Sequence, residues 1–140
     1  MKSASSWVLD PRIEQDSVPL GELSLCCVRL AKDANYPWLI LVPRRAGLVE
    51  LTDLSPEDRT QLLAEIDLTA RALKAVTACD KLNIASLGNV VAQLHVHVIA
   101  RRRNDPAWPR PVWGAVPAAP YDPGARDRLG AALREKLWPA

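Results

Sequence analysis

Residues 93–99 constrain the fold of this chain more than any other segment, because polar and apolar side chains alternate along them. Alternation with a period of two is typical of a half-buried β-strand. Successive side chains on a strand point to opposite faces, so Gln93, His95 and His97 are expected on one face and the apolar residues between them in the core. His95 and His97 are the only two histidines in the chain. Two imidazoles held side by side predict a site on this face.

The remaining strand patterns predict an α+β domain built on an antiparallel sheet of about five strands. They cover three further segments, residues 18–32, 38–42 and 81–87. We divide the first of these into two short strands at a turn formed by Gly21 and Glu22, and we extend the histidine strand to residue 100.

Two helices are expected outside the sheet. The clearer one spans about residues 56–77, because Ser55 is a good N-cap and Pro56 suits the first helical position. Its apolar residues recur at spacings of three and four, so we expect it to lie on the sheet. A final helix over about residues 123–137 closes the chain.

Length and composition favour a single domain over residues 1–140 and exclude several classes of partner. The formal net charge of +2 is too small to indicate nucleic acid or a membrane surface as a partner. No apolar run approaches the ~20 residues of a membrane span, and the first residues lack the pattern of a signal peptide. The three cysteines fit a reducing compartment, so a cytoplasmic location is expected.

The chain changes character beyond residue 101. Arg101, Arg102 and Arg103 form a basic run, which is usually a solvated patch. Residues 104–123 then carry six prolines and two tryptophans, Trp108 and Trp113. Long irregular loops in a compact domain are usually functional or disordered, and the tryptophans favour an ordered, packed loop.

The two histidines fit three kinds of role. They are a structural pair on a solvated face, two ligands of a metal ion whose remaining ligands lie elsewhere, or a nucleophile and its partner in catalysis on phosphorus. In the third case one imidazole attacks and the other hydrogen-bonds the substrate. Gly88 and Asn89 form a turn just before the strand, where backbone amides can approach phosphate oxygens closely.

Residues 93–101 resemble the signature of the histidine triad (HIT) superfamily, His-φ-His-φ-His-φ-φ, in which φ is apolar. Residues 38–44 are similar to the family's strand that ends in a proline and basic residues. The long helix, Asn83 and the glycine turn follow in the family's order, so the resemblance covers a core of about residues 20–103. The whole chain, including its segment 104–140, most resembles a bacterial HIT-like group related to diadenosine tetraphosphate hydrolases.

This resemblance implies an α+β HIT-like fold, usually a homodimer, that binds nucleoside phosphates and cleaves them at the α-phosphate. It implies no cofactor and no metal. The residue that attacks phosphorus and forms a nucleotidyl-histidine intermediate matches His95. The residue that contacts phosphate or the bridging oxygen matches His97, and Gln93 occupies the first position of the triad.

The resemblance also implies a set of substrate-binding residues. Asn83, Gly88 and Asn89 fall near positions that hold phosphate, and Asp33 near a position that binds the ribose hydroxyls. Trp108 follows the motif strand, as does a tryptophan that approaches the active site in some relatives. It is therefore expected to act as a lid over the site.

The chain departs from the family pattern at three positions. Gln93 replaces the first histidine, Trp38 stands where many members have a further histidine, and Val90 stands near a common serine or threonine. The His95 tautomer can still be set by a backbone carbonyl that accepts from Nδ1, which leaves Nε2 free to attack. Two hypotheses remain: a nucleotide hydrolase or transferase, and a HIT-fold protein that binds a nucleotide with little or no turnover.

Overall fold

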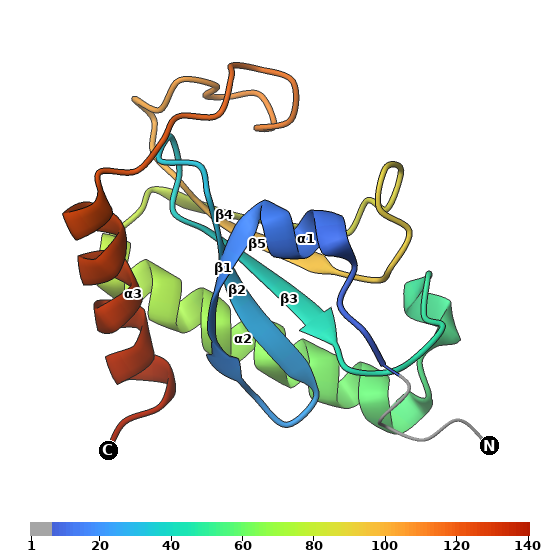
Figure 1. The fold of residues 1–140 in the computed structure, drawn as a ribbon. Helices are drawn as coiled ribbons and strands as arrows, with labels where there is room; N and C mark the ends of the chain where they lie inside the picture. The colour runs from blue at the N-terminus through green and yellow to red at the C-terminus, as the bar shows by residue number, and fades with distance from the viewer. Residues whose placement is uncertain (1–6) are drawn as a thin grey trace.

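The computed structural model describes residues 7–140, and its centre is a five-stranded antiparallel sheet in the order β1-β2-β3-β5-β4 (Figure 1). This confirms the α+β class and the sheet expected from the sequence. The strands span Ser17–Glu22 (β1), Cys26–Ala31 (β2), Trp38–Pro43 (β3), Lys81–Ala85 (β4) and Val96–Arg101 (β5).

Helices cover both faces of this sheet. The long helix α2, Pro56–Thr77, lies across one face, and the C-terminal helix α3, Pro123–Leu137, packs beside it against α2 and β1 (Figure 1). Both were predicted with these bounds. The short helix α1, Pro11–Gln15, lies over the opposite face and was not predicted; a short 3-10 turn, η2, spans Leu51–Asp53. Within residues 7–140 no helix is both long and apolar enough to cross a bilayer.

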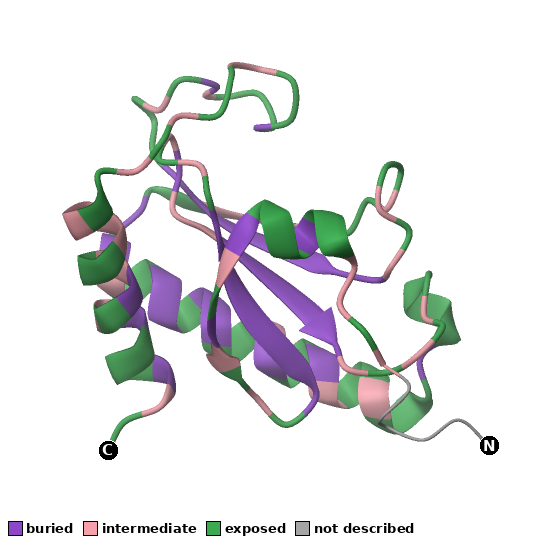
Figure 2. Cartoon of the chain, in the orientation of Figure 1, coloured by how far each residue is buried: buried purple, intermediate pink, exposed green. Residues whose placement is uncertain are grey.

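The main core lies between the sheet and α2, and it takes the apolar half of the histidine strand. Leu94, Val96 and Val98 are buried there, as the alternation predicted, and the central strands are buried along their length (Figure 2). His97 and Ile99 therefore point to the other face of the sheet. The alternation of the sequence thus separates the core from the site.

Three strand boundaries differ from the expectation. Strand β5 begins only at Val96, because the N–H of Leu94 donates to the carbonyl of Leu48 instead of a neighbouring strand. Strand β4 ends at Ala85, two residues early. The first hairpin turns after Glu22 rather than at Gly21, and a Cβ at Gly21 would lie 2.8 Å from the ring of Trp138. Gly21 makes room for that ring.

Arg101 was expected in a solvated patch and is instead 1% exposed. Its guanidinium donates to both carboxylate oxygens of Asp105 at 2.8 and 3.0 Å and to Oδ1 of Asn83 at 2.8 Å. It also lies over the rings of Tyr36 and Trp108. A buried charge needs such complete pairing, and this cluster fixes the start of the C-terminal segment. That segment is ordered and packed, as the tryptophans suggested.

A buried carboxylate on α2 sets where β2 begins. Glu65 is 2% exposed, and its oxygens accept from the N–H groups of Leu25 and Cys26 at 2.9 and 2.8 Å. We expect Glu65→Ala to leave both N–H groups buried without a partner and to lower the free energy of unfolding by about 3 kcal/mol. Urea denaturation measures this loss. On the same helix Asp67→Ala removes only the exposed pair with Arg71 and should cost about 0.5 kcal/mol or less; equal losses would contradict the assigned role of Glu65.

Candidate active site

The two histidines form the centre of the candidate site. His97 lies on β5 and His95 directly precedes it, and their rings lie edge to face with centroids 4.9 Å apart. Both side chains are buried, although they line a pocket. A pair that sits in a pocket does not fit the solvated, purely structural alternative.

His95 is held by the backbone of its own segment. Its Nδ1 lies 2.6 Å from the carbonyl oxygen of Gln93. A carbonyl oxygen only accepts hydrogen bonds, so Nδ1 carries a proton, and in the neutral ring the lone pair lies at Nε2. This is the arrangement expected for a residue that attacks phosphorus.

His97 is held in the opposite tautomer by Trp38 of the neighbouring strand. The indole Nε1–H of Trp38 donates to Nδ1 of His97 at 2.9 Å. An indole only donates, so Nδ1 of His97 must be unprotonated and the proton lies on Nε2. The site therefore contains one imidazole with a free lone pair and a second with a free N–H.

His97 is neutral at physiological pH. Burial lowers its pKa from the ordinary 6.5 to about 4, and the nearby His95 lowers it further in the same direction. The hydrogen bond from Trp38 acts the same way, because it occupies the nitrogen that a second proton would need. His97 thus offers a permanent N–H donor rather than a positive charge.

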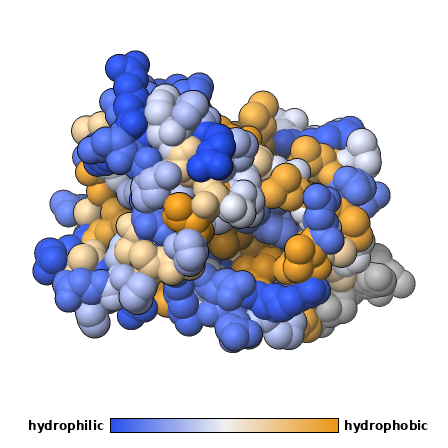
Figure 3. All heavy atoms as spheres, turned by 90° about the horizontal axis from the view of Figure 1, so that it is seen from above, coloured by the Kyte–Doolittle hydropathy of each residue, from blue (hydrophilic) through white to orange (hydrophobic). Residues whose placement is uncertain are grey.

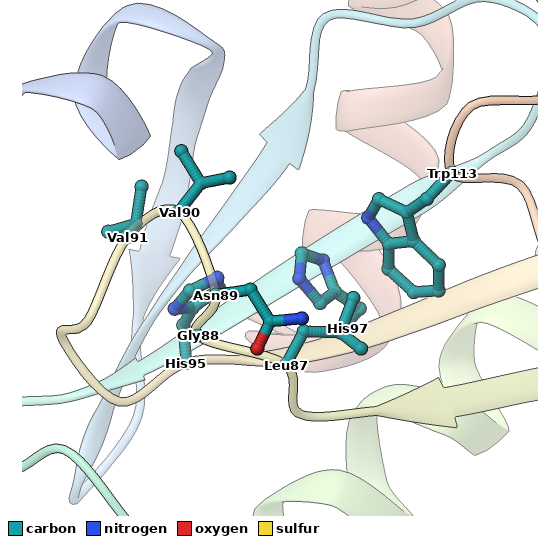
Figure 4. Close-up of a pocket in the computed structure, with 8 residues that line it drawn as sticks. All are labelled: Leu87, Gly88, Asn89, Val90, Val91, His95, His97 and Trp113. Carbon is teal, nitrogen blue, oxygen red and sulfur yellow. The ribbon is translucent and has the colours of Figure 1, made fainter.

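The pocket beside the histidines has a volume of about 270 Å³. Figure 4 shows a loop approaching it from one side and Trp113 from the other, with the histidines between them. Gly88 has a φ of 81°, in the left-handed region that favours glycine, and this lets the loop turn back over the pocket. The lining residues are Leu87, Gly88, Asn89, Val90, Val91, His95, His97 and Trp113.

The structure brings four of the predicted site residues together, namely His95, His97, Gly88 and Asn89. Asn83 shares the sheet face of His97, but its Oδ1 accepts from Arg101. Gln93 contributes its backbone carbonyl only, because its side-chain amide bonds to the backbone of Val8 and Asp10. The glutamine side chain is therefore not part of a network with the histidines.

Asp33 lines a second, neighbouring pocket of about 400 Å³ together with Trp38 and Trp113. One of its carboxylate oxygens accepts from the N–H groups of Asn35 and Ala119, which ties the C-terminal segment to the end of β2. Because Trp113 lines both pockets, the two cavities adjoin.

Trp113 lies at the candidate site, whereas Trp108, the tryptophan expected there from the sequence, does not. Trp108 lies over Arg101 and is not part of the pocket wall. Trp113 packs edge to face on His97 and on Trp38, with ring centroids 5.0 and 5.6 Å apart. In the structure the N–H of Trp108 donates to Asp105, the partner of Arg101. The sequence holds both tryptophans in one Pro-rich segment and does not show which of them reaches the site. The roles of Trp38 and Trp113 were missed for this reason.

Two histidines alone do not complete a metal site, so the metal alternative needs further ligands beside them. No group of three or more histidine, cysteine, aspartate or glutamate side chains in residues 7–140 is placed to hold a metal ion.

Comparison with known proteins identifies the class of protein that this fold and site define. The sequence matches the family model of the HIT domain over residues 12–104. The chain therefore belongs to the HIT domain family. A search of curated proteins finds no match.

Solved structures of HIT proteins are similar over nearly the whole chain. A histidine triad protein from Bradyrhizobium japonicum is 52% identical, with 94% of this chain and 98% of that one covered and a TM-score of 0.93. One from Sinorhizobium meliloti is 47% identical, with 96% and 100% covered and a TM-score of 0.93. One from Marinobacter aquaeolei is 41% identical, with 94% and 96% covered and a TM-score of 0.90. The similarity includes the C-terminal segment, since so little of each chain is left out.

The low pKa of His97 makes folding stability depend on pH. The unfolded chain binds a proton at this histidine near pH 6.5, whereas the folded chain does so only near pH 4. Stability is therefore highest above pH 6.5 and falls as the pH drops from 6.5 to 4. We expect His97 alone to lower the free energy of unfolding by about 2.5 kcal/mol between pH 8 and pH 4.5. Urea denaturation of the wild type and of His97→Gln at both pH values isolates the contribution of His97. An equal pH dependence of the free energy of unfolding in both proteins would refute the lowered pKa of His97.

Removing the indole donor should release the His97 tautomer. In Trp38→Phe the Nδ1 of His97 loses its partner, so we expect a mixture of tautomers in place of Nε2–H alone. Ring-nitrogen chemical shifts from NMR measure this directly. Trp38→His restores an N–H donor and should recover much of the Nε2–H form. A single unchanged tautomer in the phenylalanine variant would show that Trp38 does not set it.

Proposed function

We propose that the protein is a nucleotide hydrolase or nucleotidyl transferase that acts at the α-phosphate of a nucleoside phosphate. The observation that carries this proposal is the pair of imidazoles in one pocket whose Nδ1 atoms are held in opposite ways, by a carbonyl acceptor at His95 and by an indole donor at His97. His95 offers a lone pair at Nε2, and His97 offers an N–H at the same site. Membership of the HIT domain family supports the same class of chemistry.

The reaction proceeds in two displacements at phosphorus. Nε2 of His95 attacks the α-phosphorus, a P–N bond forms, and the bond from phosphorus to the leaving group breaks. The Nε2–H of His97 hydrogen-bonds the leaving atom and supports the charge or proton that this atom acquires. Water then attacks the same phosphorus, the P–N bond breaks, and a nucleoside monophosphate and free His95 result. In a transferase another acceptor takes the place of water.

The two adjoining pockets suit the two ends of such a substrate. The pocket with Gly88 and Asn89 takes the phosphate, close to His95. The larger pocket takes the nucleoside, because Trp38 and Trp113 present aromatic surface there and Asp33 presents a carboxylate that accepts from ribose hydroxyls. Asn83 lies in the wall of neither pocket, and its Oδ1 accepts from the buried Arg101. Trp113 takes the lid role that the sequence assigned to Trp108.

We propose dinucleoside polyphosphates, such as diadenosine tetraphosphate, and nucleoside phosphoramidates as the substrate class. Incubation with diadenosine tetraphosphate or adenosine phosphoramidate should release AMP, measured by chromatography. We expect His95→Ala to lower the rate about a thousandfold or more, because no other group replaces the nucleophile. His97→Ala should lower it about a hundredfold, since it removes one donor to the leaving group.

The outcome separates the two functional hypotheses. Release of AMP that survives His95→Ala would contradict the assignment of His95. Tight AMP binding measured by calorimetry, without turnover of any of these substrates, would instead establish a HIT-fold nucleotide-binding protein. Trapping of a nucleotidyl adduct on His95 by an alkaline denaturing quench, which preserves the acid-labile P–N bond, followed by mass spectrometry would support the covalent route.

We further propose that the protein acts as a homodimer in the cytoplasm. Strand β4 is one of the two edges of the sheet, and its residue Ile84 is half exposed, which is a surface suited to a second copy. Its three cysteines are unpaired, as in proteins of reducing compartments. Light scattering should give twice the mass of one chain, and Ile84→Lys should lower it. A monomer in the wild type would contradict the dimer.

A further inference from the structure

The first described residues of the chain pass beside the histidine segment and are bonded to it. We call residues 8–12 the N-terminal strap. The side-chain amide of Gln93 engages the strap at both of its atoms: Oε1 accepts from the N–H of Asp10 and Nε2 donates to the carbonyl of Val8, each at 2.8 Å. These contacts join residues more than 80 positions apart in the sequence.

Gln93 connects the strap directly to His95. Its carbonyl oxygen is the group that accepts from Nδ1 of His95, so the same residue grips the strap with its side chain and the nucleophile with its backbone. A hydrogen bond from the backbone N–H of Arg12 lowers the pKa of Asp10, and the Arg12 guanidinium lowers it further.

The strap also holds the loop that lines the pocket. Nη1 of Arg12 donates to the carbonyl of Val90 at 2.9 Å, and Asp10 accepts from both the backbone and the guanidinium of Arg12. Leu9 of the strap and Val91 of the loop pack against one apolar cluster on the site face of the sheet. Apolar residues gather around a hollow of the molecular surface in the view from above (Figure 3). The strap and the loop are thus joined by a hydrogen bond and share one apolar cluster.

From these contacts we infer that the N-terminal strap is a functional part of the site, and that Gln93 and Arg12 are positioning residues for the proposed reaction. Gln93 fixes the carbonyl that orients His95, and Arg12 fixes the loop that receives the phosphate. The glutamine at the first position of the triad then has a role of its own: its amide offers both a donor and an acceptor, and so it binds the strap with two hydrogen bonds. The turnover part of this inference rests on the proposed function.

The first experiment needs no substrate. In Gln93→Leu both bonds to the strap are lost, and we expect the backbone N–H of Asp10 to exchange with deuterium about tenfold faster or more. The ring-nitrogen chemical shifts of His95, measured by NMR, should change from those of one tautomer to those of a mixture of tautomers. Gln93→Glu keeps the acceptor for Asp10 but loses the donor to Val8, so exchange at Asp10 should stay close to wild type.

The second experiment divides the effects on turnover. Gln93→Leu should lower kcat about tenfold with little change in KM, because it disturbs the nucleophile. Arg12→Met should raise KM about threefold to tenfold and leave kcat within about twofold, because it frees the phosphate loop. Arg71→Met serves as the control, since it removes an exposed arginine that pairs with Asp67 on α2, and should change neither value.

Two results would overturn the inference. One is unchanged exchange at Asp10 in Gln93→Leu, which would show that the strap does not depend on Gln93. The other is faster exchange at Asp10 in Gln93→Leu while the ring-nitrogen shifts of His95 and, in an active protein, kcat stay unchanged. A wild-type protein inert toward all substrates would refute the proposed function alone, because the exchange and ring-nitrogen measurements on the free protein still decide the role of the strap.

Discussion

The site depends on the register between strands β3 and β5. In this antiparallel pair Ile40 lies opposite His97 and Trp38 lies opposite Ile99, so Trp38 and His97 are diagonal neighbours on one face. Diagonal neighbours on a sheet are close enough for the indole N–H of Trp38 to donate to the imidazole of His97. A slip by one residue would turn His97 toward α2 and Val98 toward the pocket, so the burial of Val98 in the main core and the tautomer of His97 are fixed by the same set of backbone hydrogen bonds.

The pocket achieves polarity without a charged side chain in its wall. Its lining consists of apolar residues, an asparagine, a glycine and two imidazoles, of which His97 is held neutral by burial. Neither Arg12 nor Arg101 lines the pocket: Arg12 lies on the strap, and Arg101 is paired with Asp105. An anionic ligand would then be recognised mainly by directed N–H groups, whose positions depend on how firmly the surrounding segments hold them. The strap and Trp113, although far from the histidines in the sequence, would therefore contribute to ligand recognition by holding these segments in place.

The sequence predicted those parts of the structure that local chemistry decides. Ser55 and Pro56 define the start of α2, and the alternation around His95 and His97 separates core from site. It did not predict the partners of Gln93, the burial of Arg101 or the choice of Trp113 over Trp108. Each of these depends on a residue brought close only by folding, such as Val8 for Gln93, Asn83 for Arg101 and Trp38 for Trp113. No periodicity or cap encodes such long-range pairings.

The three cysteines give the molecule an unreactive background for thiol chemistry. All three are buried and unpaired, and burial raises the pKa of Cys26 and of Cys27, so little thiolate is present at neutral pH. Val90, by contrast, is 77% exposed at the tip of the pocket loop. A single cysteine introduced there would take up a fluorescent or spin label selectively in the natural background. The signal of such a label would report how the pocket loop responds to a ligand, without removal of the natural cysteines.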